Sequence, residues 1–473
     1  FLTDICGMTG AEADSTRRCV DENTLITLGN GNVKKIKDIQ IGDKVMSVNR
    51  FGLSESKSVT NVFNNGVKKV FKVTTIHGKE LIATEDHKVF TQDGYKQIKN
   101  LNINDSIMSL KKINADKDNL RPNERLSCQE MFLIGMLIGD GTIYTTSRTG
   151  EDNINPSFTN SEMTLIDKFK ECVISRIRTY GKPVNCEFII NSQNGVDVDK
   201  IYNIRIKTPT SNNALIRLLD KYNLRHHSAN KVLPDEFMSY PIGEKLQNLL
   251  GGLFSTDGGC YGTYIDYSTN SEILANQIKM LLLKFGIYSY IIKKWIPDYK
   301  YYSYRVYISQ IDSFLNFKKY ILPFVIGNKN TQYLQIINNA LLNESKYNYL
   351  LPNKCKNEIR DNMIIFNKSF NDIGNALGYE NNNFNVHSTE FGISDYKAKE
   401  ISKELYIPYT YWLLNTDYIP LKVKKIEFIG ETNVYDIEVE DNHNYIANGL
   451  VVHNCIGKKL LKELEEQLPK ILD

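Results

Sequence analysis

A histidine, an asparagine and a cysteine stand next to one another near the end of the chain, in the stretch GLVVHNC at residues 449–455. An asparagine side-chain amide can attack its own backbone carbonyl, which closes a five-membered imide and cuts the chain. At Asn454 that reaction would release Cys455, and His453 could move the protons that the slow unassisted reaction needs. The same tripeptide is also compatible with a turn after a buried strand at 450–452. The chemical interpretation therefore requires a second nucleophile upstream, which moves the preceding chain onto the cysteine.

A second nucleophile of the required kind is Cys19, which opens the stretch CVDENTLITLGNG. A cysteine thiol is a good nucleophile, and its attack on the carbonyl of Arg18 would turn an amide into a thioester. Between the two ends lie TEDH at 84–87 and VYDIEVEDNHNYIANG at 434–449. Together, and in this order, these stretches resemble an intein, a self-splicing protein insert, that runs from Cys19 to Asn454. The resemblance implies the all-β, horseshoe-like Hint fold that inteins share with hedgehog autoprocessing domains.

The resemblance also implies a role for each matching residue. Thr84 and His87 match a T-x-x-H motif, in which the threonine holds the strained scissile region and the histidine protonates the leaving amide nitrogen. Asp436 matches an aspartate near the second nucleophile, and His443 would help Asn454 to cyclise. The second nucleophile attacks the thioester, imide formation releases the insert, and an S-to-N shift joins the flanks without any cofactor. In isolation, His87 also fits a hydrogen-bonded strand residue and Asp436 also fits a turn cap.

Two copies of another motif lie between these ends, LIGMLIGDG at 133–141 and LGGLFSTDG at 250–258. In each copy, small residues four apart would let two helices pack closely, as small-residue faces do in other helix pairs. This packing would bring Asp140 and Asp257 together at helix ends where the macrodipole does not favour negative charge. A divalent cation would relieve the repulsion, and Mg²⁺ suits oxygen ligands and phosphodiester hydrolysis.

The paired motif resembles that of the LAGLIDADG homing endonucleases, over residues 125–330. The resemblance implies an α/β (α+β) domain with pseudo-twofold symmetry that cuts double-stranded DNA at a long specific target, with Asp140 and Asp257 as the metal ligands. Ile138 and Ser255 replace the first aspartate of the family's motif, which the family tolerates because the second acidic position carries the metal. Either nonapeptide alone would be an ordinary amphipathic helix, so the pair is the informative feature.

Strands and a short repeat inside this region predict how it would contact DNA. The sequence TNSE at 159–162 and at 269–272 has the form of a helix capping box, with threonine as the N-cap. Alternation along the strands turns basic side chains away from the apolar face, although such a face is often only solvated. We expect contacts with phosphates and base edges from Arg205, Lys207, Lys293, Lys294 and Arg305. The family also implies one lysine beside each metal site, and the candidates are Lys207 and either Lys293 or Lys294.

The splicing residues must be held by strands. IKDIQIGDKV at 36–45 and IKNLNINDSI at 98–107 are two copies of one β unit, and the stretches around them alternate in period two. Strands of the same kind return near the C-terminal end, so one β domain contains both ends and tolerates a long insertion. We expect a flanking segment at 1–18, a splicing domain at 19–112 and 421–454, an endonuclease at 125–330, a helical extension at 331–420 and a second flanking segment at 455–473. The extension is expected to serve packing, with accessory DNA binding as the alternative.

Composition limits the remaining possibilities. The chain has 473 residues of which 41% are hydrophobic, enough for several domains with real cores. It contains no run of about 18 apolar residues, and its first twenty residues carry several charges, so we expect neither a membrane span nor a signal peptide. Eight cysteines without a CxxC pair predict free thiols rather than a zinc site. We expect a cytoplasmic monomer.

The flanks suggest a host protein. Removing residues 19–454 would join them into GAEADSTRRCIGKK, which resembles a segment of the catalytic alpha subunit of bacterial DNA polymerase III. The intein-less host gene would then be the DNA target. Two alternatives remain: a splicing element whose nuclease is only a DNA-binding relic, and an autoprocessing domain that cleaves without ligation. The aspartates of the paired motif argue against the first, and the intact nucleophiles at both ends argue against the second.

Overall fold

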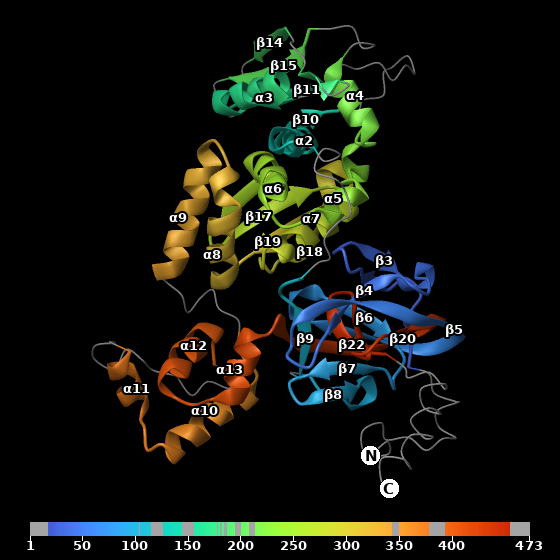
Figure 1. Cartoon of the computed structure of the whole chain (residues 1–473), viewed down its shortest axis with the longest axis vertical. Coiled ribbons are helices and arrows are strands. Elements are labelled where there is room, and N and C mark those ends of the chain that lie inside the picture. Colours follow the sequence, from blue (N-terminus) through green and yellow to red (C-terminus); the bar gives the residue numbers. More distant parts are fainter. Residues whose placement is uncertain are drawn as a thin grey trace. The chain divides into compact units, whose positions relative to one another are not determined.

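The chain folds into two compact units (Figure 1). The computed structural model describes residues 18–103, 105–114, 126–143, 156–176, 178–179, 182–183, 187–193, 200–207, 213–342, 350–377 and 393–454. Unit 1 contains the described residues up to 114 and from 350 onward, and unit 2 contains those from 126 to 342. The flanking residues 1–17 and 455–473 lie outside the described part. No helix within that part is long and apolar enough to cross a membrane.

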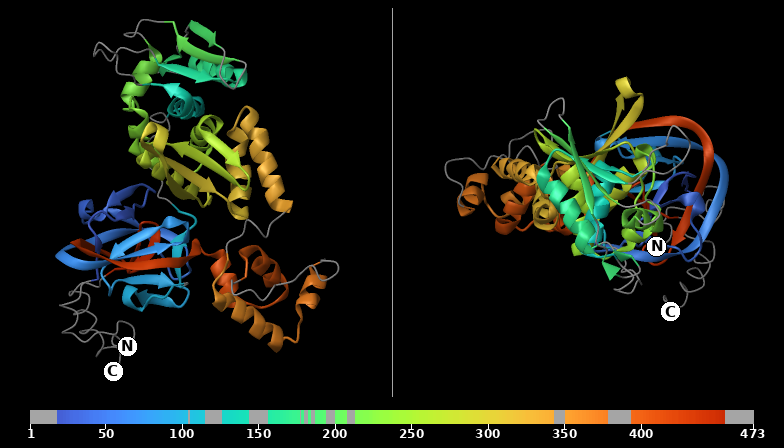
Figure 2. Two further views of the ribbon diagram at one scale, coloured as in Figure 1. Left: turned by 180° about the vertical axis from the view of Figure 1, so that it is seen from behind. Right: turned by 90° about the horizontal axis from the view of Figure 1, so that it is seen from above.

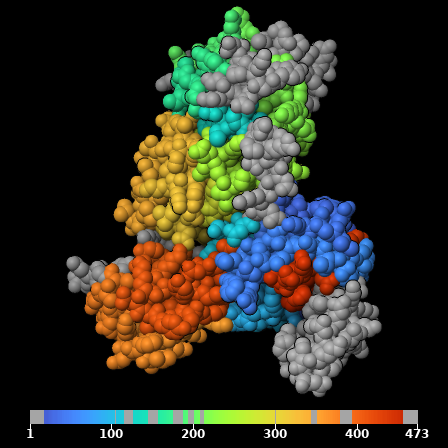
Figure 3. All heavy atoms as spheres, in the orientation of Figure 1, coloured from blue at the N-terminus to red at the C-terminus, as the bar shows by residue number. Residues whose placement is uncertain are grey.

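Unit 1 is built on a sheet of 12 strands to which both ends of the chain contribute. The strands are β1 (Val20–Asp21), β2 (Leu25–Thr27), β3 (Val33–Lys35), β4 (Lys44–Val48), β5 (Ser54–Thr75), β6 (Glu80–Ala83), β7 (Lys88–Thr91), β8 (Gly94–Gln97), β9 (Ser106–Leu110), β20 (Tyr418–Val439), β21 (Asn444–Ala447) and β22 (Leu450–His453). Their order is β3-β2-β21-β22-β7-β9-β20-β1-β6-β5-β4, and β8 pairs with β7. Strands before and after the insertion therefore alternate in one sheet, as the period-two pattern predicts. In the space-filling view, red atoms of the last strands lie among blue atoms of the first (Figure 3).

Two long strands give this sheet its curvature. β5 and β20 have 22 residues each and run antiparallel, side by side, as one curved ribbon (Figure 2). Their register shifts at four places, and each shift adds local twist and bend. Because of this bending, β20 pairs with β9 along its first residues and with β1 and β5 further on.

The duplicated β unit forms two equivalent turns. Each copy begins with a short 3-10 helix, η1 (Ile36–Asp38) or η3 (Ile98–Asn100), whose isoleucine is buried. In each copy, the repeated aspartate also forms an ion pair with a lysine of the preceding strand. These pairs are Lys34–Asp43 (2.8 Å) and Lys96–Asp105 (2.9 Å). The sequence repeat is therefore a repeat of contacts as well.

The insertion leaves and rejoins the β domain at neighbouring points. The N–H of Lys111, just after β9, donates to the carbonyl of Asp417, just before β20 (2.9 Å). The Asp417 carboxylate accepts hydrogen bonds from the Ser54 N–H (2.8 Å) and from the Asn114 side-chain amide (3.1 Å). These bonds tie the exit and the entry of the inserted segment to the same place on the sheet.

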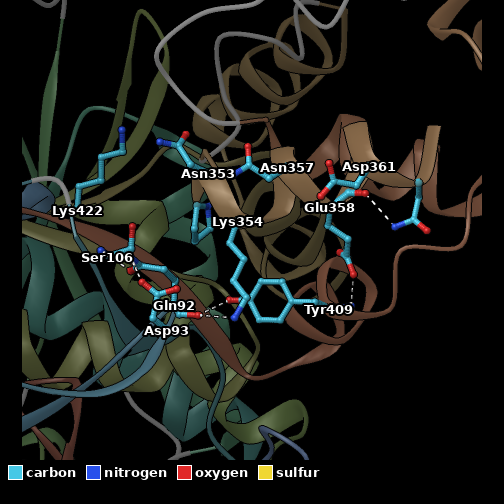
Figure 4. Close-up of a pocket in the computed structure, with 12 residues that line it drawn as sticks. Gln92, Asp93, Ser106, Asn353, Lys354, Asn357, Glu358, Asp361, Tyr409 and Lys422 are labelled. Atoms are coloured by element: carbon cyan, nitrogen blue, oxygen red, sulfur yellow. Dashed lines mark hydrogen bonds between the residues drawn. The ribbon is translucent and has the colours of Figure 1, made fainter. Parts of the chain in front are cut away.

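The helical stretch expected at 331–420 is divided between the two units. Helix α9 (Asn328–Leu342) belongs to unit 2, whereas α10 (Asn353–Ile365), α11 (Phe370–Ala376), α12 (Asp395–Glu404) and α13 (Pro408–Asn415) belong to unit 1. The Glu358 carboxylate of α10 accepts hydrogen bonds from the N–H groups of Tyr409 and Thr410 at the start of α13. The Tyr409 hydroxyl donates to the carbonyl of Gln92 beside β7 (2.9 Å; Figure 4), which attaches the helices to the β domain.

Unit 2 consists of two halves with a similar order of elements, and the first half has an additional pair of short strands, β12 (Arg178–Thr179) and β13 (Lys182–Pro183). The first contains α2 (Cys128–Asp140), β10 (Gly141–Thr142), β11 (Ser157–Asn160), α3 (Met163–Arg176), β12, β13, β14 (Phe188–Gln193), β15 (Ile201–Ile206), α4 (Ala214–Lys221) and the linking α5 (Asp235–Ser239). The second contains α6 (Glu244–Thr256), β16 (Gly258–Tyr261), β17 (Tyr264–Thr269), α7 (Glu272–Lys284), β18 (Tyr290–Ile296), β19 (Tyr301–Ile308), α8 (Ile311–Tyr320) and α9. The main sheets have matching strand orders, β10-β11-β15-β14 and β16-β17-β19-β18.

The two halves meet through α2 and α6, the helices of the repeated motif. A Cβ added to Gly135 would collide with the backbone of Leu249, and one added to Gly252 would collide with the Phe132 carbonyl oxygen. Gly139 lies against Thr256 in the same way. The predicted stripe of small residues is therefore the contact itself, and it lets the two backbones approach directly.

The capping-box prediction for TNSE is wrong. Thr159 and Thr269 are still strand residues, in β11 and β17. Ser271 is the N-cap of α7, and its hydroxyl accepts a hydrogen bond from the Leu274 N–H (3.2 Å). Glu272 begins that helix instead of standing three positions inside it, so its carboxylate cannot reach back to a threonine N-cap.

Replacement of Gly252 by alanine tests the close contact of the two helices. We expect Gly252→Ala to lower the free energy of unfolding of unit 2 by about 1–3 kcal/mol, because overpacking outweighs the gain in helix propensity. The chain has two tryptophans, Trp295 in unit 2 and Trp412 in unit 1. A Trp412→Phe background therefore reports unit 2 alone by fluorescence during urea denaturation.

Asn248→Ala on the same helix is the matched control, because this side chain reaches only the Glu244 carbonyl (2.8 Å). Equal stability of the two variants would contradict the close backbone contact.

Candidate functional site

Cys19 is the last residue before β1 and is held between two neighbouring strands. The register of Val20 with Ala83 and with Tyr435 places Cys19 between Thr84 and Asp436. The N–H of Cys19 donates to the Thr84 hydroxyl oxygen (3.1 Å), and the N–H of Thr84 donates to the Cys19 carbonyl (2.9 Å). Thr84 thus bonds both the N–H and the carbonyl of Cys19, the residue that follows the expected scissile bond.

The thiol of Cys19 lies in a buried environment. It packs with Val70 and Val434 and is fully inaccessible to solvent. Burial, followed by the negative charge of Asp436, raises the pKa of the Cys19 thiol to about 12. The thiol is therefore protonated at neutral pH, and its attack on a carbonyl requires transfer of its proton to a base.

His87 lies near the backbone of Arg18, the residue before Cys19. Its ring is completely buried, and neither ring nitrogen makes a hydrogen bond of normal geometry to another described atom. Burial lowers the pKa of His87 to about 3, and the main opposing influence is the backbone of Arg18. The imidazole is therefore neutral in the resting state. Once it has taken a proton it is a strong acid, ready to pass that proton to a leaving amide nitrogen.

Asn454 is positioned by the turn between β20 and β21. Its N–H donates to the His443 carbonyl (3.1 Å). With the side-chain amide oriented to satisfy both of its atoms, Nδ2 donates to the same carbonyl (2.7 Å) and Oδ1 accepts from the Val439 N–H (2.8 Å). The side chain is fully buried, so water does not compete for these bonds.

Two histidines flank this asparagine. Nδ1 of His453 contacts the Asn454 carbonyl oxygen, and the ring edge packs on Tyr95 with 4.7 Å between ring centroids. Burial lowers the pKa of His453 to about 4. His443 has a left-handed backbone (φ 51°), and its Nδ1 has no partner among the described residues. Both histidines therefore lie next to Asn454.

The two junctions come together on adjacent strands. Val452 pairs with Val89, and the same register continued by two residues sets Asn454 opposite His87. The charge of Arg18 acts on both His87 and His453. Asp436 is fully buried and accepts a hydrogen bond from the Tyr445 hydroxyl (3.0 Å). Cys455 lies outside the described residues.

Unit 2 contains a pair of half-buried carboxylates, Asp140 and Asp257, at the ends of α2 and α6. Burial, followed by the negative charge of Asp140, raises the pKa of Asp257 to about 6. Burial also raises the pKa of Asp140, while a hydrogen bond from the Asn160 amide to its Oδ2 (2.7 Å) opposes that change. The two aspartates therefore act on each other electrostatically, as the motif geometry predicts.

Two lysines that the sequence reasoning missed belong to this cluster. Nζ of Lys231 donates to the carbonyls of Ile138 and Gly139 (3.1 Å to the latter) at the end of α2. Nζ of Lys329 donates to the Thr256 carbonyl at the end of α6. Burial lowers the pKa of both lysines, and both aspartates oppose that shift. Each helix end thus carries one carboxylate and one ammonium group.

These donor groups fit a hard divalent cation. Among the described residues, no group of three or more histidine, cysteine, aspartate or glutamate side chains forms a metal cage. Magnesium, however, is commonly held by one or two carboxylates together with water and substrate phosphates. Asp140 and Asp257 would supply those carboxylates.

A comparison with protein families decides what unit 1 is. The model of the intein splicing domain matches residues 26–454. The chain belongs to the intein family. The match spans the interrupted β domain from β2 to Asn454.

Curated proteins similar to this intein include a replicative DNA helicase and protein RecA. It is 25% identical to the replicative DNA helicase DnaB of Nostoc sp. over 93% of the chain and 49% of the relative. It is 23% identical to protein RecA of Mycobacterium tuberculosis, over 94% of the chain and 58% of the relative. The chain spans about half the length of the first of these relatives.

Solved structures similar to parts of the intein come from two classes. A DnaB intein from Synechocystis sp. is 27% identical, with a TM-score of 0.18, and the match covers 19% of the chain and 68% of that structure. Variants of the homing endonuclease I-DmoI are 12% identical, with a TM-score of 0.28, over 41% of the chain and 95% of that structure.

The strand register of unit 2 places four of the five basic residues expected to contact DNA on corresponding sheet faces, and Lys293 on the opposite face. Arg205 lies opposite Ser157, on the face away from the buried Ile204, and Lys207 follows on the same side. Arg305 and Lys294 share the corresponding face of the second sheet, where they pair with Ile292 and Ser303.

Lys293 does not lie on the sheet face that carries Arg305 and Lys294. It pairs with Tyr304 on the face that carries the buried Val306, and its ammonium group lies 4.2 Å from the ring centroid of Tyr302. A one-residue step along a strand reverses the direction of the side chain, so Lys293 and Lys294 cannot face DNA together.

The lysines named as metal-site candidates also lie elsewhere. Lys207 forms an ion pair with Glu187 (3.1 Å), whereas Lys231 and Lys329 are the lysines whose charges act on the aspartates. Each of them follows an asparagine, but Asn-Lys also occurs at 353–354 and 367–368. That signal is too common to have identified them.

Replacement of Asp257 by asparagine should show how much its charge destabilises unit 2. The pKa of Asp257 in the folded protein, about 6, lies above its ordinary value of 3.8, so the folded state binds this proton more tightly than the unfolded state. The group therefore destabilises the protein above pH 6, and the penalty vanishes as the pH falls towards 4. We expect Asp257→Asn to stabilise unit 2 by up to about 3 kcal/mol at pH 7.5 and to have little effect at pH 4.

The measurement is thermal unfolding followed by Trp295 fluorescence, with EDTA present so that no cation shields the pair. Asp167→Asn, at an exposed position of α3, serves as the control. The same stabilisation at both pH values would contradict an electrostatic origin.

Proposed function

We propose that this intein excises itself and joins its flanks through Cys19, Cys455 and Asn454. The observation that supports this most directly is the arrangement of a buried thiol beside Thr84 and His87, with Asn454 at the end of the adjacent strand.

The first step is an N-to-S acyl shift at Cys19. The thiol gives its proton to His87, and the sulfur attacks the carbonyl carbon of Arg18. The C–N bond to Cys19 then breaks, and the nitrogen takes the proton back from His87. Hydrogen bonds from Thr84 hold the peptide in place while its geometry changes. The product is a thioester with a free amine at Cys19.

The later steps transfer the N-terminal flank to Cys455 and join the two flanks by a peptide bond. The Cys455 thiol attacks the thioester carbonyl, and its proton passes to the departing sulfur of Cys19. Nδ2 of Asn454 then attacks its own backbone carbonyl, which breaks the bond to Cys455, while His453 and His443 exchange the protons. The freed amine of Cys455 takes the acyl group from its own sulfur, so Arg18 and Cys455 are joined by a peptide bond.

Intact-mass spectrometry of the whole chain, expressed under reducing conditions, tests this proposal. We expect an excised product of residues 19–454 and a joined product of residues 1–18 and 455–473. Cys19→Ala should abolish the joined product, because no thioester forms, while cleavage at Asn454 can continue. Cys260→Ala removes a cysteine of unit 2 and should change nothing.

Precursor alone would contradict splicing. Release of both flanks without their ligation would favour the alternative, an autoprocessing domain that only cleaves.

We further propose that unit 2 is a magnesium-dependent endonuclease that cuts double-stranded DNA. Asp140 and Asp257 would hold the cation, which when bound activates water and stabilises the leaving oxygen. Lys231 and Lys329 would add positive charge beside the reacting phosphate, and the partial burial of the cluster strengthens these interactions. The retention of two carboxylates and two lysines favours an active enzyme over a DNA-binding relic.

The DNA would lie along the outer faces of the two sheets. Arg205 and Lys207 of the first half and Lys294 and Arg305 of the second supply positive charge on those faces. Arg305 already has a partner in Asp266 (3.9 Å), so a phosphate would compete with an internal carboxylate. The target would be the host gene without the intein. We propose the DNA polymerase III alpha subunit as that host on the flanking sequence alone.

Cleavage of a plasmid that carries the DNA encoding residues 1–18 joined to 455–473 tests the nuclease. We expect double-strand cuts with Mg²⁺ and none with EDTA. Asp140→Asn or Lys231→Met should slow cutting roughly a hundred-fold or more, while gel-shift binding is kept. Asp167→Asn is the control.

Binding without cutting by the parent chain would establish the relic alternative. Cutting that survives Asp140→Asn together with Asp257→Asn would exclude these residues as the metal ligands.

A further inference from the structure

A β-bulge in the long strand β5 lies beside the first nucleophile. Asn433 of β20 pairs with Val67, and Tyr435 pairs with Asn64. Two residues of β5, Asn65 and Gly66, thus stand opposite the single residue Val434. Gly66 has a left-handed backbone (φ 68°), and its N–H donates to the Asn64 side chain (3.0 Å). Bulges of this kind re-aim a side chain.

Asn65 is the first residue of this bulge. Its Nδ2 lies 3.1 Å from the Cys19 sulfur and donates a hydrogen bond to it. This bond connects β5 with the start of β1 across 46 positions of sequence. Val434, which stands opposite the bulge, packs against Cys19, so Asn65 lies on the same face of the sheet as the nucleophile.

A thiolate at Cys19 needs such a donor. The charged groups that act on it are Asp436 of β20, Lys68 of β5 and Asp86 before β7, and the neutral His87 lies near the backbone of Arg18. The two carboxylates disfavour negative charge on sulfur, whereas Lys68 and the Asn65 amide favour it. Asn65 donates its hydrogen bond to the sulfur itself.

We propose that Asn65 is a catalytic residue of the first splicing step, which holds the Cys19 sulfur and stabilises its thiolate through the amide N–H. The inference rests on the proposed splicing function and deepens it. As the thiol proton leaves for His87, the Asn65 N–H keeps its hydrogen bond to a sulfur that now carries negative charge. Hydrogen bonds to charged groups are stronger than those to neutral ones. Asn65 releases the sulfur as the bond to the Arg18 carbonyl carbon forms.

The test isolates this step in an Asn454→Ala, Cys455→Ala background, where the reaction stops at the thioester. Dithiothreitol then releases the N-terminal flank, and the rate of release is followed from pH 6 to pH 10. Asn65→Leu keeps the size of the side chain without the donor. We expect release to be roughly ten- to a hundred-fold slower at pH 7, with the pH midpoint moved upward. Asn65→Ser, which keeps a donor, should retain part of the rate.

A second pair of variants moves Asn65 without replacing it. An added Cβ at Gly66 meets no atom within 4 Å, so only the left-handed backbone limits substitution. Asparagine tolerates that conformation and valine does not. We expect Gly66→Asn to react as the parent does and Gly66→Val to share the slow rate and the shifted pH midpoint of Asn65→Leu.

Parental rate and pH midpoint in Asn65→Leu would overturn the proposal. A downward shift of the midpoint would overturn it as well, because it would mean that the amide oxygen, and not the N–H, faces the thiol. An equal loss of rate at every pH would indicate a purely structural role and would also refute it. If the parent releases no flank with dithiothreitol, the splicing proposal itself fails. The pH dependence of iodoacetamide labelling at Cys19, compared between parent and Asn65→Leu, then still decides whether Asn65 stabilises the thiolate.

Discussion

Exclusion of water from ionisable groups disfavours charge in both units. In unit 1 burial keeps the Cys19 thiol protonated and the imidazoles of His87 and His453 neutral. In unit 2 burial raises the pKa of Asp257 to about 6, so this carboxylate is still charged at neutral pH, at a cost in stability. A charge at these positions therefore needs a matching partner. In the proposed reactions the partner of the thiol is a proton acceptor and a hydrogen-bond donor, and the partner of the carboxylates is a cation.

Both units contain a duplicated structural element. In unit 1 two copies of a β unit place ion pairs at equivalent corners of the sheet. In unit 2 two α/β halves place one aspartate and one lysine at each of two adjacent helix ends. The long strands β5 and β20 then close the sheet, and their bulges set where individual side chains point. Regular strand pairing determines which residues are neighbours, and the bulges determine the directions of individual side chains.

Sequence reasoning reached the residues whose chemistry is tied to a local pattern. Motifs predicted Cys19, Thr84 and His87, which the structure brings close together, and the pair Asp140 and Asp257. Period-two alternation predicted the strands on both sides of the insertion. The reasoning failed where position depends on tertiary contacts. Lys231 and Lys329 reach the aspartates from a linker and from a separate helix, with no fixed spacing to either motif. Lys293 was misplaced because the register of a strand cannot be read to one residue from its sequence. TNSE was misread because the strand still includes the threonine in both copies, and the helix begins later, at Met163 or Glu272.

The hydrogen bond between Lys111 and Asp417 has an evolutionary consequence. Because the inserted segment leaves and rejoins the sheet at one place, its loss would open no gap among the strands and would require only a short connecting turn. Mutations in unit 2 would therefore leave the fold of unit 1 intact, so selection on the two proposed activities can be separate. Under that proposal, a lineage could lose DNA cleavage by drift while its host gene still depends on accurate excision.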